Sequence, residues 1–130
     1  MLILRVCSGY GAAEIPKLLE HSEAIAIKLD AIHALEEVEL AEYLAKKAFK
    51  NKTNIANKFK YEFLLWLTGK RDIKSAVEET KSDGNEFYII IFSGNGSELL
   101  KELNVKKLEL GLSKKAEPLQ LERISLSRLK

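Results

Sequence analysis

Short apolar runs and helical patterns alternate along the first part of the chain. The runs Leu2–Val6 and Ala24–Leu29 have the length and the content of branched residues that are typical of buried strands. Between them, Ile15, Leu18 and Leu19 recur at helical spacing and give one apolar face. The pattern therefore predicts a strand, a helix and a second strand before residue 30.

The middle of the chain has the pattern of three successive helices. Asp30 can cap the first, a break at Asn51–Thr53 ends it, and Asn54 or the threonine before it can cap the second. Gly69 is suited to end the second helix, and Asp72 can cap the third. The apolar positions of the three helices are Ile32, Leu35, Val38, Leu40, Leu44 and Ala48; Ile55, Phe59, Phe63, Leu64, Trp66 and Leu67; and Ile73, Ala76 and Val77.

The aromatic and branched run Phe87–Phe92 carries the strongest strand pattern, and its length and composition predict a central strand. A short helix is expected through Leu99–Leu103, while the pattern after Pro118 predicts no definite element. No repeat or linker divides residues 1–130. The sequence predicts a single α/β domain with a small mixed sheet flanked by several helices, three of them consecutive.

The net charge of +2 conceals a strong segregation along the chain. Residues 43–74 carry 9 basic and 2 acidic side chains, a net charge of +7, whereas residues 1–42 carry 3 basic and 8 acidic ones, a net charge of −5. A basic face suits phosphate groups or an acidic partner, although a lysine-rich solvated surface would give the same counts. The lone Cys7 and the absence of a long apolar stretch lead us to expect a cytoplasmic protein without membrane contact.

The residues that could support catalysis are few. Cys7, His21 and His33 are too few for a metal centre or an activated nucleophile, and each suits an ordinary structural role. The loop around Gly94 and Gly96 lacks the Gly-Lys-Ser/Thr ending of a phosphate-binding loop, so a tight turn is favoured. We therefore expect a non-enzymatic protein without a cofactor; a small enzyme that binds a nucleotide at this loop is an alternative.

The basic middle of the chain mixes lysines with asparagines and aromatic residues, which is the composition of a surface for single-stranded RNA. Lysine attracts phosphate, asparagine can pair with base edges, and an exposed ring can stack on a base. Phe59, Phe63 and Trp66 follow the apolar spacing of their helix and are expected in the core, which leaves Tyr61 as the freer ring.

The same segment has a recognisable order of motifs. A histidine and a leucine stand near the start of a long helix with small residues along it, followed by a Glu-x-Leu-Leu stretch, a Gly-x-Arg turn and an alanine in the next helix. With these motifs, Ala31–Thr80 resembles the small subunit of the KEOPS tRNA-modification complex that binds the PRPK-type kinase. The matching residues are His33, Leu35, Ala41, Ala45, Ala48, Glu62, Leu64, Leu65, Leu67, Gly69, Arg71, Ile73 and Ala76. Asp72 departs from the family pattern, which has glutamine there.

The resemblance implies a non-catalytic regulatory subunit. Such a subunit would bind and stimulate the kinase-like ATPase of KEOPS, contact the other subunits through it, and recruit tRNA by its single-stranded 3′ CCA end. The tRNA would then receive threonylcarbamoyl on the adenosine beside the anticodon. On this basis the expected tRNA-binding residues are Lys52, Asn54, Asn57, Lys58, Lys60, Lys70 and Arg71.

The apolar tail is the expected contact with the kinase. Ile124, Leu126 and Leu129 can serve as interface anchors, although the same residues would suit the edge of a sheet. A general single-stranded RNA-binding or scaffold module unrelated to KEOPS is the alternative function.

Overall fold

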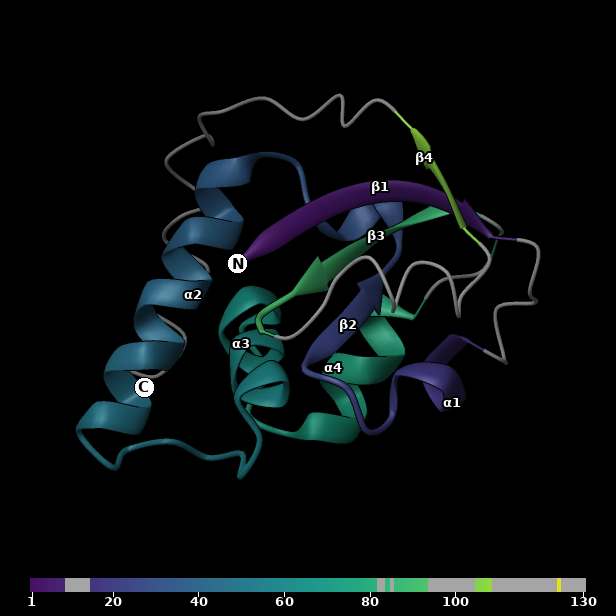
Figure 1. Cartoon of the computed structure of the whole chain (residues 1–130). Helices are drawn as coiled ribbons and strands as arrows, with labels where there is room; N and C mark the ends of the chain where they lie inside the picture. Colours follow the sequence, from purple (N-terminus) through teal and green to yellow (C-terminus); the bar gives the residue numbers. More distant parts are fainter. Residues whose placement is uncertain (9–14, 82–83, 85, 94–104, 109–123, 125–130) are drawn as a thin grey trace. The chain divides into compact units, whose positions relative to one another are not determined.

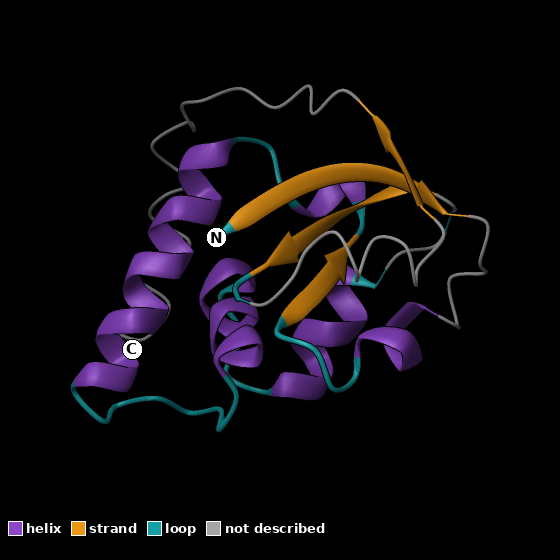
Figure 2. Ribbon diagram, in the orientation of Figure 1, coloured by secondary structure: helices purple, strands orange, loops and turns teal. Residues whose placement is uncertain are grey.

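The computed structural model describes residues 1–8, 15–81, 84, 86–93, 105–108 and 124 (Figure 1). The chain forms two compact units, one comprising Met1–Leu29 with Lys81–Gly111 and the other Asp30–Thr80 with Leu112–Lys130. The first unit holds the sheet and the second holds three successive helices; Figure 2 colours strands orange and helices purple. The predicted α/β class is confirmed.

The sheet of the first unit contains β1 (Leu2–Ser8), β2 (Ala24–Ile27), β3 (Glu86–Ile91) and β4 (Val105–Leu108) in the order β2-β3-β1-β4. All pairings of these strands are antiparallel, so the prediction of a mixed sheet was wrong. β1 and β2 run in the same direction, but β3 lies between them, which is the split β-α-β arrangement. The central position predicted for β3 is confirmed.

One face of this sheet packs on α1 (Ile15–Leu19). Because side chains alternate along a strand, Phe87, Ile89 and Ile91 of β3 share a face. They form a buried cluster with Val6 and Ala24 of the neighbouring strands, and Ile15 and Leu19 of α1 complete it. β4 was not predicted from the sequence, since its four residues include two lysines, which are typical of exposed edges.

The second unit contains α2 (Leu35–Lys50), α3 (Phe59–Thr68) and α4 (Ile73–Thr80), which confirms the three consecutive helices. α3 contacts both α2 and α4 and is buried on most of its circumference, including Phe63, Leu64, Leu65 and Leu67. The 16 residues of α2 bury a narrower stripe. Its buried members include the small residues Ala41, Ala45 and Ala48. Small side chains let neighbouring helices approach closely.

Two predicted caps were wrong because both helices begin several residues after the expected capping residues. Asp30 lies in the 3-10 turn η1 (Leu29–Ala31), whereas Glu37 inside α2 accepts hydrogen bonds from the backbone amides of His33 (2.7 Å) and Ala34 (3.0 Å). This is the reach-back half of a capping box. α3 likewise begins at Phe59, so neither Thr53 nor Asn54 caps it.

In the turn between α3 and α4, the structure confirms both predicted roles, that of Gly69 as the end of one helix and that of Asp72 as the cap of the next. Gly69 ends α3 with φ 73°, in the left-handed region that favours glycine, and its amide donates to the Leu65 carbonyl at 3.0 Å. Asp72 Oδ2 accepts hydrogen bonds from the backbone amide (3.0 Å) and the hydroxyl (2.8 Å) of Ser75. These bonds lower the pKa of the Asp72 carboxyl below its ordinary value.

Candidate nucleic-acid interface

The loop Asn51–Lys58 connects α2 to α3 and carries four of the seven predicted RNA-binding residues. It begins with a sharp reversal, in which Lys52 adopts φ 58° and the Thr53 amide donates to the Ala48 carbonyl at 2.8 Å. Residues other than glycine and asparagine rarely adopt this backbone conformation. The surrounding contacts therefore hold the backbone in a defined path.

Glu62, one turn inside α3, anchors this loop. It is completely buried, and its Oε1 accepts hydrogen bonds from the backbone amides of Ile55 (2.9 Å) and Ala56 (3.0 Å). Its Oε2 accepts a bond from the indole nitrogen of Trp66 at 3.1 Å. Burial of a carboxylate is costly unless donors satisfy it, and here three N–H groups do so. The loop is thus tied to the buried interior of its unit at its midpoint.

The polar side chains of the anchored loop differ in their exposure. Lys52, Asn57 and Lys58 are exposed, as is Ile55 at 43%. Asn54 is half-buried, and its Nδ2 donates to the Ala56 carbonyl at 2.8 Å, so this amide supports the loop as well. Lys52, Asn57 and Lys58 therefore supply the accessible cations and amide that the sequence predicted for this segment.

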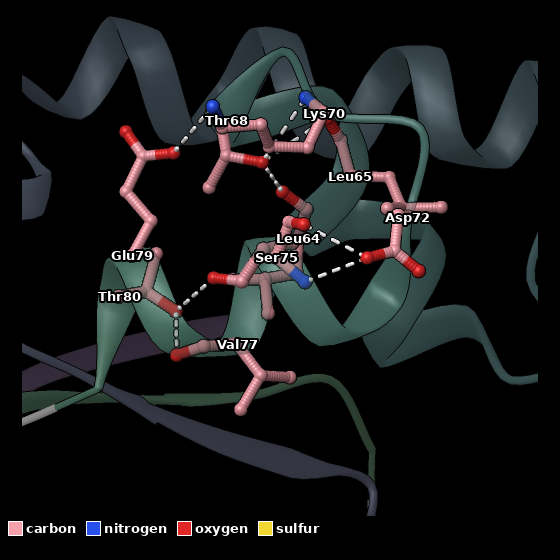
Figure 3. A network of polar contacts seen from close by, with 10 residues as sticks. Leu64, Leu65, Thr68, Lys70, Asp72, Ser75, Val77, Glu79 and Thr80 are labelled. Carbon is pink, nitrogen blue, oxygen red and sulfur yellow. Dashed lines mark hydrogen bonds and ion pairs between the residues drawn. The ribbon is translucent and has the colours of Figure 1, made fainter.

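The second group of predicted residues lies at the other end of α3, in the turn Gly69–Asp72. Lys70 and Arg71 are both exposed. Lys70 Nζ lies 3.7 Å from Glu79 Oε2, and the Lys70 amide donates to Thr68 Oγ1 at 3.3 Å (Figure 3). Glu79 thus partly neutralises the cation that a phosphate would need.

The structure does not gather the seven predicted residues into one cluster. At a rise of 1.5 Å per residue, the ten residues of α3 separate the two groups by about 15 Å along the helix. Lys60 faces inward and is only 4% exposed, with its nitrogen 5.3 Å from the centroid of the Tyr61 ring, a cation–π distance. It therefore departs from the expectation of an accessible RNA-binding lysine.

The aromatic residues of this unit divide largely as expected. Phe63 is buried, and Phe59 is half-buried, with its ring centroid 5.8 Å from that of Phe49. Tyr61, expected to be the freer ring, is half-buried. The ring that stands out from the surface is Tyr43 on α2, which is 62% exposed and was not singled out from the sequence. Its position off the apolar stripe of α2 is the signal that could have revealed it.

Of the three residues expected to contact a kinase, Leu126 and Leu129 lie outside the described residues. Ile124 is described and is completely buried, so it belongs to the interior rather than to an exposed set of interface anchors. Gly94 and Gly96, the alternative nucleotide loop, also lie outside the described residues.

The described residues were also searched for metal sites and for membrane-spanning helices. They contain no group of three or more His, Cys, Asp or Glu side chains that could hold a metal ion. No helix in the described part of the chain is long and apolar enough to cross a membrane. The sequence matched no protein-family model and no curated protein when it was compared with them.

Proposed function

We propose that this protein is the non-catalytic regulatory subunit of a KEOPS complex, acting in the cytoplasm. It recruits tRNA by the single-stranded 3′ CCA end, and it binds and stimulates the kinase-like ATPase subunit. The resemblance of Ala31–Thr80 to the small KEOPS subunit supports the family and the partners named in this proposal. The loop Asn51–Lys58 supplies the physical support.

The observation that carries the RNA-binding part is the anchoring of this loop by Glu62. A loop that is already held in one conformation loses less entropy when it binds a ligand than a freely moving one. Lys52 and Lys58 then present ammonium groups to phosphates, and the Asn57 amide can both donate to and accept from a base edge. This combination suits a short single strand.

Arg71 supplies a second contact at the far end of α3. Its guanidinium can donate two parallel hydrogen bonds to one phosphate, which a lysine cannot do. Because about 15 Å separate this turn from the loop, the RNA would lie along α3 to reach both. Arg71 is exposed as this arrangement requires.

The first test measures binding of purified protein to one labelled tRNA, with and without its terminal CCA, over a range of salt concentrations. We expect trimming to weaken binding, with an affinity that falls as salt increases because lysine contacts release counterions from phosphates. Equal affinity for both RNAs would contradict capture of the tail.

The second test assigns the binding to these residues. Lys58→Ala combined with Arg71→Ala should weaken tRNA binding on the order of tenfold at moderate salt. Lys17→Ala combined with Lys81→Ala is the matched control, since both lysines are exposed and belong to the other unit. Unchanged affinity of the first variant would reject the site.

The kinase part of the proposal has its own test. Leu126→Glu should weaken binding to the KEOPS ATPase without changing the affinity for tRNA. If a correctly folded Leu126→Glu variant binds the ATPase normally, the tail is not the contact. Absence of any effect on the ATPase by the wild-type protein would instead favour a general RNA-binding module.

A further inference from the structure

The outer face of α2 carries a basic stripe that the loop site does not include. Tyr43, Lys47 and Lys50 are spaced four and three residues apart, which places them on one face of the helix. All three are exposed, Tyr43 at 62%. Neither Lys47 nor Lys50 forms an ion pair with another described residue, whereas Lys46 beside them pairs with Glu42 at 3.8 Å. The stripe therefore offers two available cations and a phenol.

The stripe is continuous with the anchored loop. Lys50 is the last residue of α2, and the chain passes through Asn51 directly to Lys52, as the path from α2 into the loop in Figure 1 shows. In the opposite direction the helix becomes acidic, with Glu39 exposed one turn before Tyr43. A polyanion that follows the stripe away from the loop would meet repulsion there, which gives the surface a defined end.

We propose that this Tyr43–Lys50 stripe binds the phosphodiester backbone of the RNA beyond the single-stranded end held by the loop. The inference rests on the proposed function, and it adds the nucleotides that follow the tail to the recognised substrate. Lysine ammonium groups and a tyrosine hydroxyl are common donors to phosphate oxygens. Such contacts set the position of an RNA without selecting its sequence.

A purely structural role would account for only part of this arrangement. Lysines in the last turn of a helix interact favourably with its negative end, which explains Lys47 and Lys50 alone. It does not explain why a large aromatic side chain stands exposed one turn before them. The tests must therefore measure RNA binding separately from stability.

The deciding experiment compares two RNAs with the double variant Lys47→Gln, Lys50→Gln. One is intact tRNA, and the other is a short single-stranded oligonucleotide that ends in CCA. We expect several-fold weaker binding of tRNA and a smaller salt dependence, lower by about two in the slope of log affinity against log salt. Binding of the oligonucleotide should stay unchanged. Unchanged affinity for tRNA, or an equal loss for both RNAs, would overturn the proposal.

The loop variant separates this inference from the proposed function. If Lys58→Ala with Arg71→Ala binds tRNA normally while the Lys47→Gln, Lys50→Gln variant binds it weakly, the tail site fails and the α2 stripe stands. The reverse result removes the stripe alone. Lys17→Gln with Lys81→Gln controls for the loss of two positive charges.

Two single variants test the stripe from its other end. Tyr43→Phe removes the hydroxyl and keeps the ring, so weaker tRNA binding by this variant indicates a phosphate contact and normal binding contradicts it. Glu39→Gln removes the acidic boundary and should strengthen tRNA binding about twofold. Thermal melting of each variant confirms that the fold is intact.

Discussion

The two ends of α3 carry similar residues in different settings. At the amino-terminal end, the loop Asn51–Lys58 is fastened by the buried carboxylate of Glu62, and its lysines project outward. At the carboxyl-terminal end, the turn Gly69–Asp72 is closed by glycine geometry and by the Asp72 cap. Its Lys70 already has an acidic partner in Glu79.

Because of this difference, segments of similar composition need not be equally available to a phosphate. Both segments are basic and exposed, yet in the first the carboxylate is buried and engaged with backbone amides, so it does not compete for the lysines. In the second, the carboxylate of Glu79 is exposed and lies next to the cation. We therefore expect the loop to dominate RNA binding and the turn to contribute less.

The largest expected effect comes from removing the anchor. Glu62→Ala leaves two loop amides and the Trp66 indole without their acceptor, and it empties space in a buried region. Since each buried donor left unsatisfied costs about 1–3 kcal/mol, we expect the free energy of unfolding to fall by about 3 kcal/mol. Urea denaturation measures this. The exposed Glu78→Ala is the control, and an equal effect of the two would contradict the anchoring role.

A smaller effect is expected when lysines at the two ends of α3 are replaced and their contributions to tRNA binding are compared. Lys52→Ala with Lys58→Ala should weaken tRNA binding on the order of tenfold. Lys70→Ala should weaken it by less than threefold, because its ion pair with Glu79 competes with phosphate. If Lys70→Ala has the larger effect in a titration with labelled tRNA, the ranking of the two ends is wrong.

The Asp72 cap provides a test confined to the turn. The pKa of Asp72 is lowered in the folded protein by its bonds to Ser75, so its stabilisation is present above the ordinary carboxyl pKa of about 3.9. It is lost as the pH falls through the folded-state pKa. Asp72→Ala should therefore lower the urea midpoint at pH 7, and the difference from wild type should shrink below about pH 4. A difference that is constant with pH would contradict the capping role.

The smallest expected effect is an increase in tRNA affinity. Glu79→Gln releases Lys70 from its ion pair, and because exposed ion pairs are weak we expect tRNA affinity to rise by about twofold or less. The gain should disappear when Lys70→Ala is present in the same chain. A gain that persists in the double variant would show that the charge of Glu79 acts on the RNA directly.

The features that were predicted correctly from the sequence are those that depend on interactions between neighbouring residues. The central strand β3, the glycine that ends α3 and the Asp72 cap each depend on a few adjacent residues, and the structure confirms all three. β4 was missed because its pairing with β1 connects residues about a hundred positions apart, and a run with two lysines gives no strand signal.

The candidate site was harder to predict because its organising contact spans the loop. Glu62 reaches back six and seven residues to the amides of Ala56 and Ile55, beyond the range of any capping pattern. α3 is buried on most of its circumference, so helical spacing could not separate inward from outward positions. Lys60 was consequently grouped with the accessible lysines, although it faces inward.

The most direct test of the account is a map of backbone amide chemical shifts in the intact protein during titration with a short RNA that ends in CCA. We expect the largest shifts in the loop, at Asn54, Ile55, Ala56, Asn57 and Lys58, with smaller ones at Lys70 and Arg71. The same RNA without CCA should leave the loop unchanged. Shifts concentrated in the sheet unit, or equal shifts with both RNAs, would contradict a tail-binding site at the anchored loop.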